Sequence, residues 1–146
     1  MNQKKRIYFL AILFFPALLF LSCDAFQEII HETVPPPDQL TSSGVVKLFK
    51  QAADSSDVDR AVGFMCSPKG VSLTALERYN MDDEMVRYLD RIHGRYMRIW
   101  SAKGSRVAGD SIVTVDAEFG WLFSWNFITH QIGDKWYISE IQEETK

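Results

Sequence analysis

The sequence predicts an α+β domain in which two or three N-terminal helices pack on a curved antiparallel sheet of about four strands. Two observations lead to this prediction. Between residues 41 and 94, apolar residues recur at the three- and four-residue spacing of amphipathic helices. Between residues 109 and 141, apolar residues alternate with polar ones or run together between glycine-containing turns. Because the helices come first, we expect them to cover one face of the sheet that follows.

The first 22 residues have the pattern of a signal peptide. Basic residues occupy positions 4–6, and residues 7–21 form an apolar run of fifteen that only Pro16 interrupts. A spanning helix needs about 20 apolar residues, so this run is short for a permanent anchor. Ordinary secretion with cleavage after Ala25, and a retained signal anchor, are the two alternatives.

The apolar run ends in Phe20-Leu21-Ser22-Cys23, which resembles the lipobox of bacterial lipoproteins. In that family the cysteine sulfur carries diacylglycerol, and cleavage makes the cysteine the new N-terminus, which is often acylated too. The resemblance implies membrane attachment through lipid on Cys23. It places the protein in a bacterial cell envelope, on the periplasmic face of either membrane or on the cell surface. Each buried CH₂ of an acyl chain adds about 0.8 kcal/mol to the free energy of membrane binding, so two or three chains would hold the protein stably on a membrane.

The residues after the lipobox divide into a tether and a single domain. Residues 23–40 contain three consecutive prolines, which favour an extended polyproline conformation. We therefore interpret them as the lipidated cysteine and a tether. Residues 41–146 are then one α+β domain, long enough to bury a core without disulfides.

The charge and the cysteines exclude several classes of function. Removing residues 1–22 takes away three basic residues and no acidic ones, which leaves 13 basic against 19 acidic residues and a net charge of −6. An acidic chain is a poor candidate for binding to nucleic acid or to anionic lipid surfaces. With Cys23 lipidated, Cys66 is the only thiol, and its apolar surroundings predict a buried, inert side chain.

Three helices are expected. The first covers residues 43–53, and the second covers 57–66 and ends before Pro68. The third starts with the acidic residues 82–84 in its first turn and stops at Gly94. Residues 71–79 are a short helix or an irregular link.

The sheet is predicted from residues 110–119, 125–132 and 135–141, with residues 96–107 as an earlier strand. Gly133-Asp134 has the composition of a tight hairpin turn. Residues 120–123 are either a bulge in one long strand or a loop tip that exposes Trp121, Leu122 and Phe123. The simpler interpretation packs these side chains in the core or along its rim.

Helices followed by a meander ending in Gly-Asp-Lys-Trp-Tyr-Ile resemble the nuclear-transport-factor-2-like (cystatin-like) superfamily. The matching pieces are residues 43–53, 57–66, 109–119 and 133–138. The resemblance implies a cone-like domain whose curved sheet wraps around a long helix. It also implies a pocket at the mouth of the cone that serves small ligands, isomerase- or dehydratase-type reactions, or dimer contacts.

No catalytic or metal-binding motif occurs, and the three histidines are widely separated, so we expect no metal site, no cofactor and no assigned catalytic residue. The basic run at Arg87, Arg91, Arg95 and Arg98 is interpreted as a solvated face paired with Glu84 and Asp90, or alternatively as a docking patch. Candidate pocket or rim residues are Tyr88, Tyr96, Trp100, Asp116, Glu118, Trp121, Phe123, Trp125 and His130.

Three hypotheses of function follow. The first is a membrane-anchored, non-enzymatic module that binds a small apolar ligand or an envelope protein. The second is a cone-pocket enzyme in which Asp116 or Glu118 acts with a tyrosine, as carboxyl groups with raised pKa do in apolar pockets. The third is a homodimer with a purely structural role.

Overall fold

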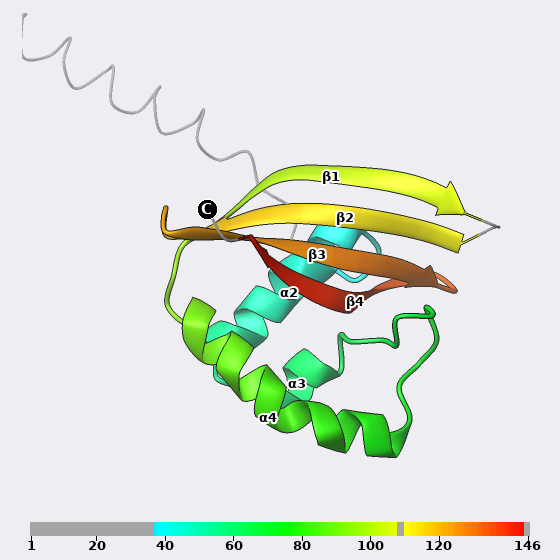
Figure 1. The fold of residues 1–146 in the computed structure, drawn as a ribbon, viewed down its shortest axis with the longest axis horizontal. Helices are drawn as coiled ribbons and strands as arrows, with labels where there is room; N and C mark the ends of the chain where they lie inside the picture. Colours follow the sequence, from blue (N-terminus) through cyan, green and yellow to red (C-terminus); the bar gives the residue numbers. More distant parts are fainter. Residues whose placement is uncertain (1–36, 108–109, 145–146) are drawn as a thin grey trace, which may run out of the picture. The chain divides into compact units, whose positions relative to one another are not determined.

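The computed structural model describes residues 37–107 and 110–144. The expectations for the signal peptide, for Cys23 and for residues 24–36 therefore lie outside the described residues. The described chain runs through three helices and then four strands (Figure 1). The helices are α2 (Ser42–Asp54), α3 (Val58–Val62) and α4 (Ala75–Ile92); the strands are β1 (Met97–Val107), β2 (Asp110–Phe119), β3 (Phe123–Ile132) and β4 (Lys135–Glu144). Within these residues no helix is long and apolar enough to cross a membrane.

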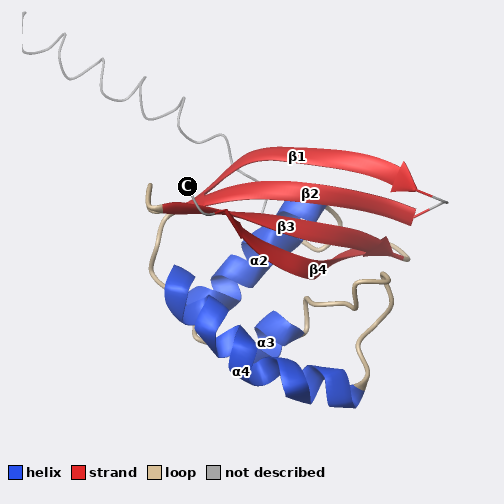
Figure 2. Ribbon diagram, viewed as in Figure 1, coloured by secondary structure: helices blue, strands red, loops and turns tan. Residues whose placement is uncertain are grey.

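The four strands form one antiparallel meander with the order β1-β2-β3-β4. All three helices lie on the same side of this curved sheet, and α2 packs against every strand (Figure 2). The predicted fold class is confirmed: a few N-terminal helices cover one face of a four-stranded antiparallel sheet.

The alternation in β2 and β3 determines which face the helices cover. Val115, Ala117 and Phe119 of β2 are buried, as are Trp125 and Phe127 of β3. Their cross-strand pairing, Val115 with Phe127 and Ala117 with Trp125, puts them on one face. Two irregularities interrupt the ladders, between Ile99 and Ser101 in β1 and between Ile128 and Thr129 in β3.

Helix α4 begins earlier than the sequence prediction. Thr74 is its N-cap, and a capping box joins the Thr74 and Glu77 side chains to each other's backbone N–H groups. The acidic residues 82–84 are therefore in the middle of the helix and not in its first turn. The C-terminal end agrees with the prediction, since His93 is the C-cap and Gly94 follows with φ +65°.

Helix α3 is shorter than predicted. It ends at Val62, and Met65 forms a parallel bridge with Ile138 of β4. The Cys66 N–H donates to the Ile138 carbonyl at 2.8 Å, and the Ile138 N–H donates to the Phe64 carbonyl at 2.8 Å. Because the backbone of residues 64–66 pairs with the edge of β4, these residues do not continue the helix. Cys66 is free and buried, as predicted.

Residues 120–122 form a turn between β2 and β3, so the loop-tip alternative is correct and the bulge is not. Gly120 and Trp121 both have positive φ, and the Leu122 N–H donates to the Phe119 carbonyl at 3.1 Å. The interpretation that packs these side chains in the core or along its rim is correct for Phe123, which is half-buried against the core, and wrong for Trp121 and Leu122, which are exposed. The two left-handed residues reverse the chain at the turn, and Phe123 returns to the sheet, where its ring stacks on the Phe119 ring with centroids 5.7 Å apart.

Candidate functional site

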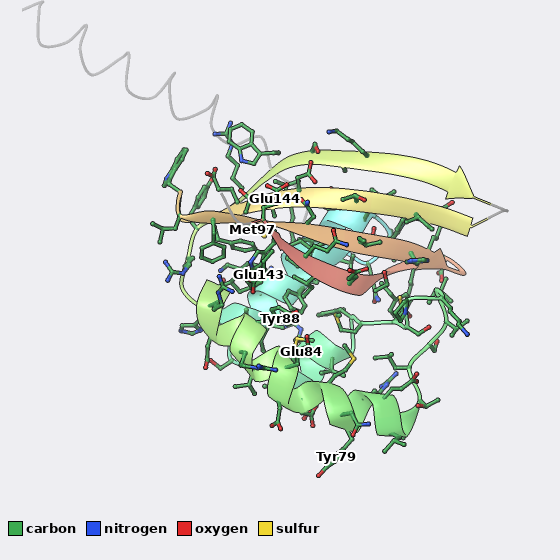
Figure 3. The ribbon with its side chains drawn as sticks, in the orientation of Figure 1. Tyr79, Glu84, Tyr88, Met97, Glu143 and Glu144 are labelled. Carbon is green, nitrogen blue, oxygen red and sulfur yellow. The ribbon has the colours of Figure 1, made fainter. Side chains whose placement is uncertain are left out.

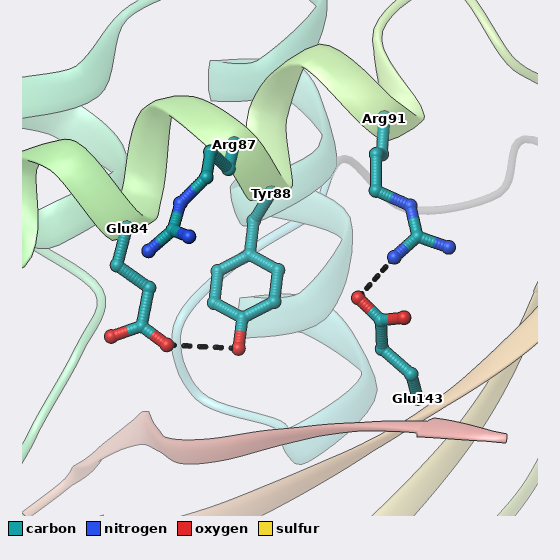
Figure 4. A pocket seen from close by; sticks show the side chains of 5 residues that line it. All are labelled: Glu84, Arg87, Tyr88, Arg91 and Glu143. Atoms are coloured by element: carbon teal, nitrogen blue, oxygen red, sulfur yellow. Dashed lines mark hydrogen bonds and ion pairs between the residues drawn. The ribbon is translucent and has the colours of Figure 1, made fainter.

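A cavity of about 270 Å³ lies between α4 and β4 (Figure 4). Helix α4 contributes Glu84, Arg87, Tyr88 and Arg91, whose spacing of three and four residues places them on one helix face. Strand β4 contributes Glu143. Glu143 pairs with Trp125 of β3 across the sheet, so it projects from the face that the helices cover.

Tyr88 lies at the centre of this cavity. Its hydroxyl donates a hydrogen bond to Glu84 Oε1 at 3.1 Å, and its ring meets the Trp125 ring edge-to-face with centroids 5.5 Å apart. Burial raises the pKa of the phenol, and the hydrogen bond and negative charge of Glu84 and the charge of Glu143 add to the rise, while Arg87 opposes it. The phenol is therefore a neutral hydrogen-bonding group at neutral pH.

Arg91 closes one side of the cavity. Its Nη1 forms an ion pair with Glu143 Oε1, and its guanidinium carbon lies 5.1 Å from the Phe123 ring centroid and 5.6 Å from that of Trp125. Both interactions fix the guanidinium plane. Arg95 lies over the outer part of Phe123 at 5.6 Å, and its Nε donates to the Arg91 carbonyl at 2.6 Å.

The charges in the cavity are balanced. Two carboxylates, Glu84 and Glu143, face two guanidinium groups, Arg87 and Arg91, around one hydroxyl. Arg87 forms no ion pair with another described residue, whereas Arg91 is paired with Glu143. The cavity therefore offers both a cation and carboxylate oxygens to a bound molecule.

Of the predicted site residues, Tyr88 lines this cavity, and two others lie behind it. Trp125 is completely buried beneath Tyr88 and Arg91, and Phe123 is half-buried beneath the two arginines. Figure 3 shows Tyr88 and Glu84 between α4 and the sheet, whereas Tyr79 on the same helix points away from it. Trp121 is exposed in the β2–β3 turn, and Tyr96 is exposed beside this turn.

Asp116, Glu118 and Trp100 lie on the opposite face of the sheet. The neighbours of Asp116 and Glu118 in β2 are buried under the helices, so these two acids project the other way. Ser101 Oγ donates to Asp116 Oδ2, and Trp100 Nε1 donates to Glu118 Oε2 at 3.1 Å. The sheet separates both acids from Tyr88, so Tyr88 is not the tyrosine partner that the enzyme hypothesis requires.

His130 is buried at the far end of β3, against the loop between α3 and α4. It does not line the cavity around Tyr88. Over the ranges 37–107 and 110–144, no group of three or more histidine, cysteine or acidic side chains is arranged to hold a metal ion.

The sequence prediction missed four of the five lining residues as site residues. Glu84, Arg87 and Arg91 were noticed, but as a solvated charged face. The expected pairing of Arg91 on its own helix was wrong, because Arg91 pairs with Glu143. The helical spacing that includes Tyr88 was a usable signal for the α4 residues. No sequence signal identified Glu143 as a lining residue, because the face of the sheet from which it projects depends on the β3–β4 register.

Comparisons with known proteins find similarity among solved structures but not among family models or curated sequences. No family model matches the chain, and no curated protein sequence matches it. A crystal structure from Nostoc punctiforme, of a protein of unknown function with a cystatin-like fold, is similar at 14% sequence identity and a TM-score of 0.48. The similarity covers 75% of this chain and 96% of that one. The fold class here follows from the helices and strands themselves.

Proposed function

We propose that this chain is a lipid-anchored protein of the bacterial envelope whose α+β domain binds a small zwitterionic molecule without catalysing a reaction. The lipobox-like sequence at Cys23 supports the anchor. The observation that carries ligand binding is the cavity in which two carboxylates and two guanidinium groups surround the Tyr88 hydroxyl.

The size and lining of the cavity determine the kind of ligand. Its volume of about 270 Å³ is slightly below the roughly 300–1,000 Å³ that is usual for small-molecule sites, so the ligand is small. Because four of its five lining side chains are charged, we replace the apolar ligand expected from the sequence with a polar one. Balanced charges match a molecule that carries one group of each sign.

Arg87 is the anion-binding group in this proposal, because it has no ion-pair partner among the described residues. The ligand's ammonium group would donate to Glu84. Since Oε1 of this carboxylate already accepts a hydrogen bond from the Tyr88 hydroxyl, Oε2 would accept from the ammonium group. Hydrogen bonds between ionised groups are stronger than those between neutral groups.

Ligand binding is tested by isothermal titration calorimetry of the full chain with free L-amino acids, glycine betaine and phosphoethanolamine. Loss of a charged hydrogen bond removes about 1.5–3 kcal/mol, so Arg87→Ala should weaken binding by roughly 10- to 100-fold. Arg78→Ala is the matched control, because Arg78 is exposed on the same helix and does not line the cavity. Saturable binding that Arg87→Ala leaves unchanged would place the ligand elsewhere.

The anchor is tested separately by mass spectrometry of the N-terminal peptide from protein purified from its native host. We expect a diacylglyceryl-modified Cys23 at the N-terminus, and release from membranes in a Cys23→Ala variant. An N-terminus at another residue would remove the anchor and leave the cavity hypothesis in place.

A further inference from the structure

The turn between β2 and β3 exposes large apolar side chains. Trp121 is 70% exposed and Leu122 is 64% exposed. Tyr96, which is 68% exposed, lies beside them, because the Gly120 N–H donates to the Tyr96 carbonyl at 2.9 Å. We call Tyr96, Trp121 and Leu122 the aromatic tip. Three adjacent side chains of this kind contribute little to the core and form a patch of the sort that contacts a partner.

The backbone of the aromatic tip holds Trp121 outward. Trp121 has φ +63°, a left-handed conformation that is uncommon for bulky residues. The hydrogen bond from the Leu122 N–H to the Phe119 carbonyl closes the turn in this form. Strained conformations of this type occur preferentially at functional positions, and here the strain is combined with exposure of the side chain.

Arginines accompany the aromatic tip. Arg95 is next to Gly120 and lies over Phe123, and Arg98 stacks on Trp100 with its guanidinium carbon 3.8 Å from the ring centroid. Neither arginine forms an ion pair with a described residue. Exposed tryptophan and tyrosine next to arginine are typical of a membrane–water interface, where rings lie at headgroup level and guanidinium groups meet phosphate oxygens.

We propose that the aromatic tip contacts the surface of a lipid bilayer. This inference rests on the anchor in the proposed function and is independent of the ligand cavity. The 13 residues of positions 24–36 have a contour length of at most about 43–47 Å. The described domain starts at the opposite end of the sheet from the tip, since the Trp136 N–H at the start of β4 donates to the Gln39 carbonyl. The ten residues of β3 span about 33 Å, so this length of chain permits the tip to reach the membrane that holds Cys23.

The test uses tryptophan fluorescence of the full chain on vesicles of equal parts phosphatidylcholine and phosphatidylglycerol. All four tryptophans lie at position 100 or later, so their emission reports on the folded domain alone. Flotation with the vesicles measures anchoring, and quenching by brominated acyl chains measures contact of the tip. We expect quenching in the wild type, most of which disappears in Trp121→Phe. Leu122→Ser should weaken the contact roughly tenfold, since it removes an apolar side chain from the bilayer.

Two controls make the result specific. Trp100→Phe should keep the quenching, because Trp100 is outside the tip. Leu76→Ser with Tyr79→Ser removes equally exposed apolar side chains from the far end of α4 and should have no effect. Flotation without quenching, or quenching that survives Trp121→Phe, would overturn the proposal. A concentration-dependent blue shift of Trp121 without vesicles would assign the tip to a dimer contact and overturn it as well. Absence of flotation would reject the anchor and the bilayer contact together, while ligand binding in the cavity would be unaffected.

Discussion

Replacing Gly70 with alanine tests how the loop between α3 and α4 packs on β3. Gly70 has φ +69°, and a Cβ built there would lie 2.7 Å from His130 Nδ1 and 3.3 Å from His130 Cγ. Observed Cβ contacts are essentially never shorter than 3.0 Å, and His130 is only 8% exposed. An alanine at this position must therefore adopt a left-handed conformation and also displace a buried ring.

The cost of the left-handed conformation and the cost of displacing His130 can be measured separately, because Gly133 has a similar φ without a crowded neighbour. The left-handed conformation costs an alanine about 1–2 kcal/mol, and forcing extra volume into a packed site costs about 1–3 kcal/mol. Gly133 has φ +65° with nothing within 4 Å of its Cβ position, so Gly133→Ala incurs only the first cost. We expect Gly70→Ala to reduce the free energy of unfolding by about 2–5 kcal/mol, and Gly133→Ala by about 1–2 kcal/mol.

Urea unfolding of the full chain, followed by far-ultraviolet circular dichroism, measures both values. Adding His130→Ala to the Gly70→Ala variant should recover part of the loss, because the ring that the new methyl group meets is then absent. Equal destabilisation by Gly70→Ala and Gly133→Ala would refute the reasoning, since the contact with His130 would then have no energetic effect.

Three further predictions concern the α4 capping box and the titrating groups Glu77 and Cys66. Thr74→Ala removes the capping box and should cost about 0.5–2 kcal/mol, measured by urea midpoint. Hydrogen bonds from the Thr74 backbone N–H and hydroxyl hold the pKa of the Glu77 carboxyl below its ordinary value, so their stabilisation is present above the unfolded pKa near 4.3 and is lost as pH falls through the folded value. Glu77→Gln should therefore lose less stability than the wild type on acidification; equal losses would contradict this. Burial raises the pKa of the Cys66 thiol to about 11, so stability should fall as pH rises above the unfolded value near 8.5. Cys66→Ala should remove that fall, and iodoacetamide labelling mapped by mass spectrometry should modify Cys66 in urea but not in the native state.

The sheet was predictable because its signals are local. Alternation along residues 113–119 gave the buried face of β2 directly, and Gly133-Asp134 gave the β3–β4 turn. Residues 125–132 were also predicted as a strand, and Trp125 and Phe127 on it are buried. These elements need no knowledge of tertiary contacts, so the sequence was sufficient to place them.

The helix boundaries failed where a local signal was misread or a distant contact decided the outcome. The start of α4 was readable, since Thr74 and Glu77 have the spacing of a capping box, but the acidic run at residues 82–84 was taken for the first turn. The end of α3 was not readable from local sequence, because Ile138 of β4 pairs with the backbone after it. An unpaired strand edge can outweigh the helical propensity of a few residues.

The α4 residues of the candidate site could be predicted from the sequence, whereas the β4 residue could not. Tyr88 was chosen for its chemistry, and its charged neighbours on α4 share a helical face with it. Glu143 enters the cavity because an irregularity between Ile128 and Thr129 fixes how β4 lies against β3. A one-residue change in such a register moves a side chain to the other face of the sheet, so no pattern within β4 alone could have identified it.

The backbone that covers the edge of β4 also limits how molecules of this protein can associate. At that edge the Trp136 and Ile138 N–H groups donate to the Gln39 and Phe64 carbonyls, and the Cys66 N–H donates to the Ile138 carbonyl, so a strand from another molecule finds the first half of β4 already paired. At the other edge, β1 carries the irregularity at Ile99 and Ser101, and charged Arg98 and Lys103 flank it. Intermolecular strand addition would therefore have to begin at β1, where a broken ladder and two positive charges oppose it. The first half of β4 and the irregular part of β1 are therefore poor places for edge-to-edge pairing between molecules.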